Sequence, residues 1–317
     1  MNRNSLHRAF APAAVAATLA LTLAACGGQS SGSDAGASGS VSVDGSSTVF
    51  PLSDAAAELM SEENPNIEVT VGSAGTSGGF EAFCAGKTDV SDASRPIDPE
   101  EQAICDKEGI DSTELQVATD ALTVVVPTDF EVDCITTEQL KTMWEPAAQG
   151  KVTNWNQVDP SFPDEELALF GPGTDSGTFD YFTDEINGEE GASRSDYEAS
   201  EDDNVIVEGV SQTPGGVGYF GFTYYEENTD TLKALEVDSG DGCVAPSSET
   251  AQSGDYTPLA RPLFIYVADK SYGDKPQVAE YVDYYIGNLT EIAEAAEYIP
   301  LNDEQLSGTE SALEGLR

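Results

Sequence analysis

Hydrophobic residues recur along residues 41–317 with two periods, and their arrangement predicts a series of strands and helices. Residues 67–71 alternate β-branched and polar side chains, which is typical of a strand. Residues 51–63 place apolar side chains three and four positions apart, which is typical of an amphipathic helix. The same criteria predict strands at 41–43, 89–94, 167–170 and 216–222, helices at 79–86, 99–108, 136–144, 277–287 and 289–298, and either type at 203–210. Strands that alternate with helices indicate an α/β protein with mostly parallel sheets.

Two uninterrupted apolar runs, at 121–126 and 263–267, predict buried strands. Each lies between blocks that have their own α/β pattern, so we expect a chain that crosses twice between two lobes. Lobe one would comprise residues 41–121 and 263–317, and lobe two residues 122–262. Ligands of open α/β sheets lie beyond the carboxyl ends of the strands, where the turns into helices gather.

Three segments share one design, in which a strand-like run is followed by a Gly/Ser/Thr-rich turn and a helix-like run. They are GSSTVFPLSDAAAELM (45–60), GSAGTSGGFEAFCAG (72–86) and GPGTDSGTFDYFTDEI (171–186). A helix N-terminus offers unpaired N–H groups and a partial positive charge, and glycine lets this backbone approach an anion closely. Two such turns in lobe one and one in lobe two predict a pocket that surrounds a small oxyanion.

The first 25 residues are predicted to be a signal peptide, with Arg3 and Arg8 ahead of an Ala-rich apolar segment too short to span a membrane. The sequence LAAC (23–26) matches the bacterial lipobox, which implies cleavage before Cys26 and a lipid on its sulfur. The alternative is an ordinary signal followed by a chance cysteine. The Gly/Ser-rich residues after Cys26, up to 40, predict a flexible tether. We therefore expect an exported protein that is lipid-anchored to the cell membrane, at its extracytoplasmic face or in a periplasm.

The charge of the chain is strongly negative. It has 58 acidic and 13 basic residues and a formal net charge of −45; the predicted signal contains two of the basic residues and no acid. Nucleic acid and anionic lipid surfaces are excluded as partners because their phosphates would be repelled. We interpret the charge as an adaptation of the surface to a salty habitat. At ~1 M salt the Debye length is ~3 Å, so local dipoles and one or two cations can still hold an anion.

Four cysteines besides Cys26 remain in the exported chain, and an even number predicts two disulfides. Three connectivities are possible. We favour Cys84–Cys105 and Cys134–Cys243, because each pair then stays within one lobe. The chain has no Cys-x-x-Cys motif, so a zinc or thioredoxin-like role is not expected.

Several motifs spread over about residues 41–300 resemble one protein family. They are DGSSTVFPL, GTSGGFEAFCAGKTDVSDASRPI, TTEQLKTMWEP, GPGTDSGTFDYF and the crossover-like segments ATDALTVVV and ARPLFIYV. The chain is similar to the phosphate-binding lipoprotein of the bacterial high-affinity phosphate ABC transporter. The resemblance implies a type II periplasmic-binding-protein fold, two α/β lobes joined by two crossover segments, with one phosphate in the cleft. It also implies a membrane permease and ATPase as partners and implies no cofactor or metal, and we expect a monomer.

The resemblance assigns phosphate-binding positions in each of the three turns. These positions are Thr48 and the Val49 amide in the first turn, Thr76, Ser77 and Gly78 in the second, and Ser176, Gly177 and Thr178 in the third; Ser46 and Ser47 are near enough to the first turn's positions to contribute.

Two positions depart from the best-known pattern of the family. Ser94 stands where that pattern has an Asp that accepts the phosphate proton, and Pro172 stands where it has an Arg. Our hypothesis is that Arg95 supplies the guanidinium and Asp175 the proton acceptor. An Arg fork matches phosphate oxygens, and a carboxylate accepts from protonated phosphate but repels fully ionised sulfate. Alternatively, Arg95 forms an ion pair with a neighbouring acid and Asp175 only caps a helix.

Two other functions fit parts of the sequence, and a third alternative is a surface adhesion or sensor protein that keeps the fold without feeding a transporter. Residues 75–79, GTSGG, match the G-x-S-x-G pattern of serine hydrolases, but the only histidine is His7, inside the predicted signal, so no catalytic base is expected. A binding protein for another oxyanion, such as sulfate, molybdate or arsenate, would need the same three turns. We therefore expect a binding protein and not an enzyme.

Overall fold

The computed structural model describes residues 37–174 and 176–317. The predicted signal peptide, the lipid attachment at Cys26 and the proton acceptor Asp175 lie outside the described residues. The predicted tether ends earlier than residue 40, because Gly39 already pairs with Ile67 of the next strand. Within the described residues, no helix has the length and apolar character needed to cross a bilayer.

The strands form one large sheet and one small one. In the large sheet the order is β2-β1-β3-β12-β4-β8-β6-β7, and β9 also pairs with β4. The bounds of these strands are β1 Gly39–Gly45, β2 Ile67–Val71, β3 Val90–Ala93, β4 Ser112–Pro127, β6 Ala168–Pro172, β7 Glu198–Ser200, β8 Gly216–Gly221, β9 Leu232–Ala234 and β12 Ala260–Ala268. The small sheet has the order β11-β10-β5, with bounds Cys243–Val244, Glu236–Asp238 and Cys134–Thr136.

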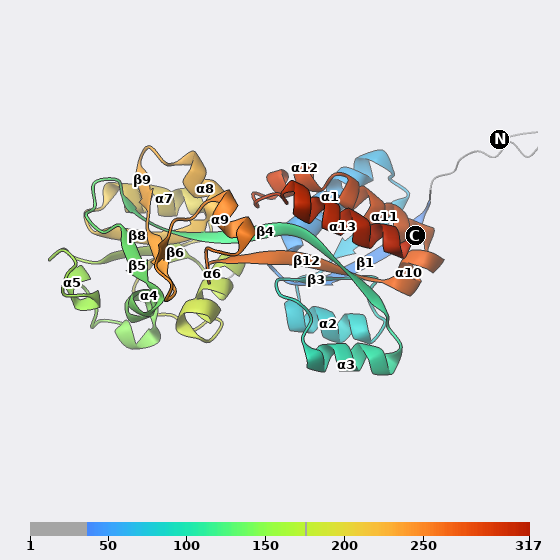
Figure 1. Cartoon of the computed structure of the whole chain (residues 1–317), viewed down its shortest axis with the longest axis horizontal. Coiled ribbons are helices and arrows are strands. Elements are labelled where there is room, and N and C mark those ends of the chain that lie inside the picture. The colour runs from blue at the N-terminus through green and yellow to red at the C-terminus, as the bar shows by residue number, and fades with distance from the viewer. Residues whose placement is uncertain (1–36, 175) are drawn as a thin grey trace, which may run out of the picture. The chain divides into compact units, whose positions relative to one another are not determined.

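The expectation of mostly parallel sheets is only partly right. Strands β1, β2 and β3 pair in parallel, as do β6, β7 and β8. The crossover strands differ, because β12 runs antiparallel to both β3 and β4, and β4 runs antiparallel to β8 and β9. Two long strands that cross between the same lobes in opposite directions pair with each other in antiparallel register (Figure 1).

The helices follow the predicted pattern closely in the first half of the chain and less closely later. Their bounds are α1 Phe50–Glu63, α2 Thr76–Cys84, α3 Pro99–Glu108, α4 Thr137–Trp144, α5 Trp155–Val158, α6 Gly177–Phe182, α7 Asp203–Gln212, α8 Phe222–Glu227, α9 Ser248–Ser253, α10 Asp269–Asp274, α11 Pro276–Gly287, α12 Leu289–Ala295 and α13 Asp303–Leu316, with short irregular helices η1 Pro146–Ala148 and η2 Thr183–Asn187. The ambiguous segment 203–210 is helical, α2 begins three residues earlier than predicted, and α13 was not predicted.

Separate clusters of buried side chains lie on the two sides of the crossover. The first core packs β1, β2 and the first part of β4 against α1, α11 and α12, and the second core packs the rest of β4 against β6, β8 and α4. Strand β4 passes from one to the other, since Val117 belongs to the first core and Val124 to the second. This change of core near residue 120 supports the lobe boundaries, which we retain as a proposal.

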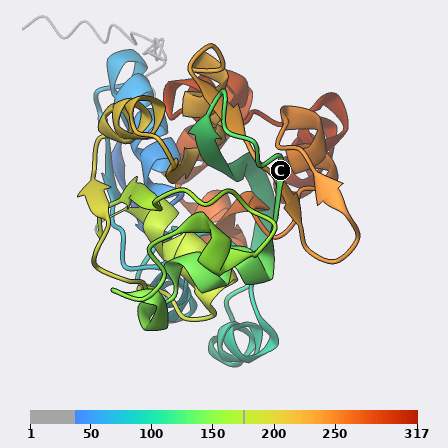
Figure 2. The ribbon, with the colours of Figure 1, turned by 90° about the vertical axis from the view of Figure 1, so that its left-hand side faces the viewer.

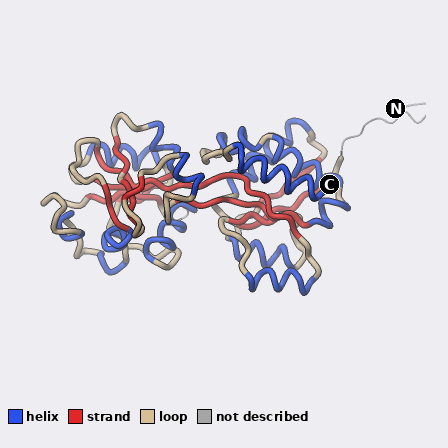
Figure 3. Tube along the Cα trace, viewed as in Figure 1, coloured by secondary structure: helices blue, strands red, loops and turns tan. Residues whose placement is uncertain are grey.

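Helices cover both faces of the strands in lobe one. Helices α2 and α3 lie on one face, and α1, α11, α12 and α13 on the other (Figures 1 and 2). The strand layer between them continues into lobe two (Figure 3). This arrangement brings the strand ends that precede α1 and α2 to the same edge of the sheet.

The predicted disulfides are confirmed. Cys84–Cys105 joins α2 to α3, and Cys134–Cys243 joins β5 to β11 in the small sheet. Each bond stays within one proposed lobe, as expected.

Candidate functional site

The first two Gly/Ser/Thr-rich turns are built by strands that end in glycine-dependent bends. Strand β1 ends at Gly45, whose φ is 148° and whose added Cβ would lie 2.1 Å from the backbone oxygen of Asp92. The Ser46 amide then donates to that same oxygen at 2.9 Å, which ties the first turn to β3. In the second turn Gly75 has a φ of 82° and precedes Thr76, the first residue of α2. Glycine is needed at both bends because other residues rarely adopt these angles.

The third turn lies between β6 and α6 and contacts the first. Ser176 caps α6, and its hydroxyl accepts from the Thr178 amide at 3.2 Å. A Cβ on Gly177 would lie 3.0 Å from the hydroxyl oxygen of Thr48. The close approach of these two turns brings residues of both lobes to one place.

All three turns contribute to one cavity of about 430 Å³ between the lobes. Its lining consists of small and hydroxyl-bearing residues of the turns, two arginines and four acids: Ser46, Ser47, Thr48, Ala74, Gly75, Thr76, Ser77, Gly78, Ser94, Arg95, Pro96, Gly177, Asp180, Tyr181, Asp184, Glu185, Glu190, Arg261 and Pro262. No histidine or lysine is among these lining residues. Among the residues that the structure describes, no group of His, Cys, Asp and Glu could hold a metal ion.

Most of the predicted site residues come together in this cavity. Those that line it are Ser47, Thr48, Thr76, Ser77, Gly78, Ser94, Arg95 and Gly177. Three others have local roles in this structure. Val49 is fully buried and its amide donates to the Ser46 carbonyl, Ser176 caps α6, and Thr178 lines a neighbouring cavity of about 300 Å³.

Ser94 holds the second turn against the end of β3. Its amide donates to the hydroxyl of Thr76 at 3.2 Å, and the two hydroxyl oxygens are 3.1 Å apart. The position that carries an Asp in the best-known family pattern therefore carries a neutral hydrogen-bonding residue that orders the turn.

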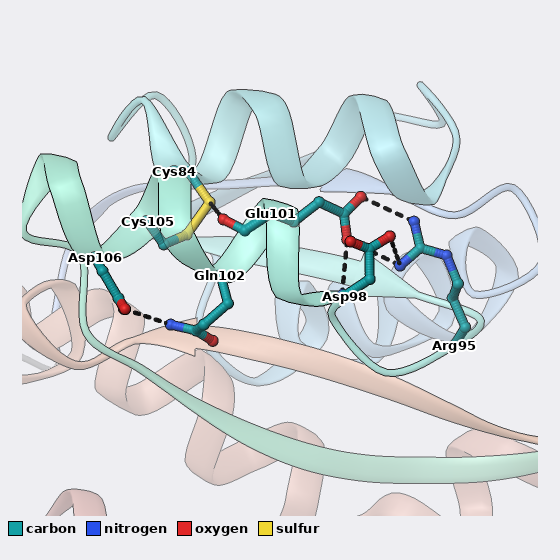
Figure 4. Close-up of a disulfide and its surroundings, with 7 residues drawn as sticks. All are labelled: Cys84, Arg95, Asp98, Glu101, Gln102, Cys105 and Asp106. Atoms are coloured by element: carbon teal, nitrogen blue, oxygen red, sulfur yellow. Dashed lines mark hydrogen bonds and ion pairs between the residues drawn. A yellow bond between two sulfur atoms is a disulfide. The ribbon is translucent and has the colours of Figure 1, made fainter.

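Arg95 lines the cavity but is already paired with Glu101 of α3 and with Asp98, the N-cap of that helix (Figure 4). Its two terminal nitrogens donate to the Glu101 carboxylate at 2.9 and 2.8 Å, and Asp98 lies at 3.6 Å. One of them also donates to the Ser77 hydroxyl at 3.0 Å. Burial is the largest single influence and tends to raise the pKa of Glu101, but hydrogen bonds from Arg95, the Asp98 amide and Ser77, together with the charge of Arg95, outweigh it and lower the pKa. The ion pair weighed as an alternative is present, and it uses much of the charge of Arg95.

A second arginine, Arg261 at the start of β12, reaches the cavity and was missed by the sequence reasoning. Its Nη2 donates to the Thr48 hydroxyl oxygen at 2.9 Å and its Nε to the Asp120 carboxylate at 3.3 Å. The guanidinium carbon lies 3.5 Å from the ring centre of Tyr181. The sequence offered one indication of this role: Arg261 is a basic residue at the edge of a buried apolar run, in a chain with few basic residues.

Four acids of the segment that follows the third turn were also missed. They are Asp180, Asp184, Glu185 and Glu190. Burial, together with the charge of Glu190, raises the pKa of Asp180; burial and the charge of Asp184 raise the pKa of Glu185. The cavity therefore offers hydrogen-bond donors from the turns, two guanidinium groups, and carboxylates that can accept a hydrogen bond from a protonated oxygen of a ligand.

The chain is similar to known proteins over most of its length. A family model described as a PBP superfamily domain matches residues 30–288. Protein SphX of Synechocystis sp. is 47% identical over 266 residues, which are 84% of this chain and 79% of that protein. Phosphate-binding protein PstS of Staphylococcus saprophyticus is 36% identical over 309 residues, which are 97% of this chain and 94% of that protein.

A solved structure of a possible phosphate binding protein from Planctomyces limnophilus has the same fold. Its TM-score is 0.83 at 41% sequence identity, and the match covers 88% of this chain and 99% of that one. The predicted type II periplasmic-binding-protein fold is confirmed.

Proposed function

Since this chain belongs to the PBP superfamily, and within it to the family of the phosphate-binding proteins PstS, we propose that it binds inorganic phosphate between its lobes and delivers it to an ABC permease. The observation that carries the proposal is the convergence of three Gly/Ser/Thr-rich turns and two arginines on one cavity. The helix N-termini, hydroxyls and guanidinium groups together form an environment for a tetrahedral oxyanion. The bound form would then dock on the permease, which works with an ATPase on the other side of the membrane.

The acids of the cavity would select phosphate from other oxyanions. A carboxylate accepts a hydrogen bond from a protonated phosphate oxygen, whereas a fully ionised sulfate has no proton to donate and is repelled. Asp180 and Glu185 are the acids of the cavity whose pKa values burial raises. We propose that acids of this group, alone or together with Asp175, are the proton acceptors.

Closure of the lobes would complete the binding site. The cavity volume of about 430 Å³ is more than ten times the roughly 30 Å³ that one water molecule occupies, and leaves space around an ion of five heavy atoms. Contacts of one anion with turns from both lobes would favour a more closed form. We further propose that the mature protein is a monomer, held at the membrane by a lipid on Cys26.

Calorimetry with phosphate, sulfate, molybdate and arsenate tests the proposed function. We expect one phosphate per chain, with sulfate at least about 100-fold weaker because the cavity carboxylates repel a fully ionised anion. Binding should persist at 1 M salt, since the donors are local.

Thr48→Val should weaken binding about tenfold or more through loss of a hydroxyl donor, whereas Thr142→Val on α4 should leave it unchanged. Tighter binding of another oxyanion would support that alternative, and ester hydrolysis would support an enzyme.

Arg95 and Glu101 should have opposite effects on phosphate affinity. Arg95→Ala removes a cation and leaves the Glu101 charge beside the second turn, so affinity should fall about tenfold. Glu101→Gln keeps a side-chain oxygen that can accept from the Asp98 backbone amide at the start of α3 but removes the charge that pairs with Arg95, so affinity should rise about threefold. If both variants bind phosphate more weakly, Glu101 serves to orient Arg95 and does not compete with the anion.

A further inference from the structure

Arg261 occupies a position that links the crossover to both lobes. It lies on β12, where it is the register partner of Asp120 on β4. Its side chain contacts Asp120 in the crossover, Thr48 in the first turn of lobe one, and Tyr181 of α6 in lobe two. Its side chain is only 19% exposed, against 37% for Arg95, so solvent screens its charge less.

The contacts of Arg261 leave part of its guanidinium open to a ligand. Arginine has five N–H donors, and among the described residues two of its nitrogens, Nε and Nη2, donate to Asp120 and Thr48. The ring of Tyr181 covers one face of the group at 3.5 Å. The edge at Nη1 therefore retains donors, and Arg261 lines the cavity.

Asp120 binds the guanidinium of Arg261 less tightly than Glu101 binds that of Arg95. Glu101 makes two short hydrogen bonds to Arg95, whereas Asp120 makes one of 3.3 Å to Arg261. Burial raises the pKa of Asp120 despite the opposing charge of Arg261, so its ionised form is disfavoured relative to that of an exposed Asp. With one long hydrogen bond to its carboxylate partner in place of two short ones, Arg261 keeps more of its donor capacity for a bound anion than Arg95 does.

We propose that Arg261 is the principal cationic ligand of the bound oxyanion and that it couples anion binding to closure of lobe two; this inference rests on the proposed function. The Nη1 edge of the guanidinium binds the anion while the Thr48 hydroxyl, which accepts from Nη2, donates its own proton to it. Tyr181 belongs to α6, and its hydroxyl donates to the Pro258 carbonyl at 2.6 Å, which fixes the orientation of its ring. Stacking of the guanidinium on this ring therefore links the position of Arg261 to that of α6. An anion that holds Arg261 thereby holds the third turn against the first.

The test is calorimetry of inorganic phosphate binding to the wild-type chain and to matched variants. Arg261→Gln should weaken binding at least about 30-fold, and Arg261→Lys, which keeps the charge but not the fork, by about tenfold. The double variant Arg261→Gln/Asp120→Asn leaves no uncompensated buried charge, so it should fold and bind as weakly as Arg261→Gln. Arg317 follows the C-terminal end of α13 and pairs with Asp283. The control variant Arg317→Gln should bind phosphate like the wild type.

The outcomes separate the two proposals. If the wild type does not bind phosphate, the proposed function fails. If the wild type binds and the folded double variant binds within about threefold of it, the role of Arg261 is refuted. A structure of the wild type with phosphate gives an independent result, since a phosphate oxygen must lie within hydrogen-bonding distance of an Nη of Arg261. Coupling to closure further requires that Tyr181→Leu reduce the phosphate-induced change in small-angle scattering, and an unchanged response would refute that part.

Discussion

Replacement of Asp92 by Asn is expected to raise the thermal stability of the protein at pH 8 and above by about 5 to 10 °C in Tm. Asp92 lies on β3 and is completely buried. Ser53 of α1 donates to its Oδ1 at 2.8 Å, while its Oδ2 has no hydrogen-bond partner among the described residues. The surrounding groups are Tyr281 and Tyr285 of α11 and the acid Asp44 of β1, and none of them is a cation.

The sign of this effect follows from the proton held by the folded state. Burial, which the Ser53 hydrogen bond opposes and Asp44 reinforces, raises the pKa of Asp92 from 3.8 to about 8. Between these values the folded chain holds one more proton at this site than the unfolded chain, so stability falls as the pH rises. Each pH unit contributes about 1.4 kcal/mol, and the accumulated cost reaches about 5 kcal/mol near pH 8 and then stays constant. Asn cannot ionise and avoids this cost.

Calorimetric unfolding from pH 4 to pH 9 would measure the difference. The gap in Tm between Asp92→Asn and wild type should be small at pH 4, grow to pH 8 and then level off. Asp89→Asn is a matched control on the preceding loop, because Asp89 is also buried but accepts from Lys275 at 2.6 Å and Ser271 at 2.8 Å. That variant should destabilise the protein. A lower Tm for Asp92→Asn at pH 8 would mean that the carboxylate is ionised and well solvated.

Removal of the Cys134–Cys243 disulfide is expected to lower the free energy of unfolding by about 5 kcal/mol while leaving phosphate affinity unchanged. The bond closes a loop of 109 residues, and the chain entropy that it removes from the unfolded state grows with loop length. Both residues lie in the small sheet, and neither lines the cavity between the lobes. Cys134→Ser/Cys243→Ser suits this test because neither cysteine is buried.

Urea unfolding of this double variant and of Cys84→Ala/Cys105→Ala would compare the two bonds. The second bond closes a loop of only 21 residues, for which the same model predicts about 3 kcal/mol. Alanine replaces these cysteines because both are fully buried and a serine hydroxyl would have to be desolvated. A loss below about 1 kcal/mol for the 109-residue loop would contradict the entropic account.

Local patterns predicted the parts of the site that depend on nearby residues in the chain. Each turn is encoded by glycines and hydroxyls that immediately precede a helix, so the three turns and most of their lining residues could be named in advance. Helix α13 was not predicted because residues 303–316 contain few apolar side chains, of which Leu313 is buried. The capping box of Asn302 and Gln305 is visible in the sequence and could have indicated the start of this helix, but the prediction relied on hydrophobic periodicity.

The charged residues of the site could not be assigned in this way. Arg95 was expected to face the anion, but α3 places Glu101 against it through a short loop that sequence patterns do not orient. Arg261 is 141 positions from Asp120 and 213 from Thr48, and only the antiparallel pairing of β12 with β4 brings them together.

The sequence by itself determined the α/β class, the disulfide pairs and the three turns that line one cavity, because short-range periodicity, cysteine positions within lobes and turn chemistry are local properties. Only the tertiary structure decided which acid pairs with each arginine of the cavity, which acids line the cavity, and that the crossover strands pair in antiparallel register. These depend on distances between segments that are far apart in the chain, where the strength of a charge is set by burial and by the partner that packing places beside it.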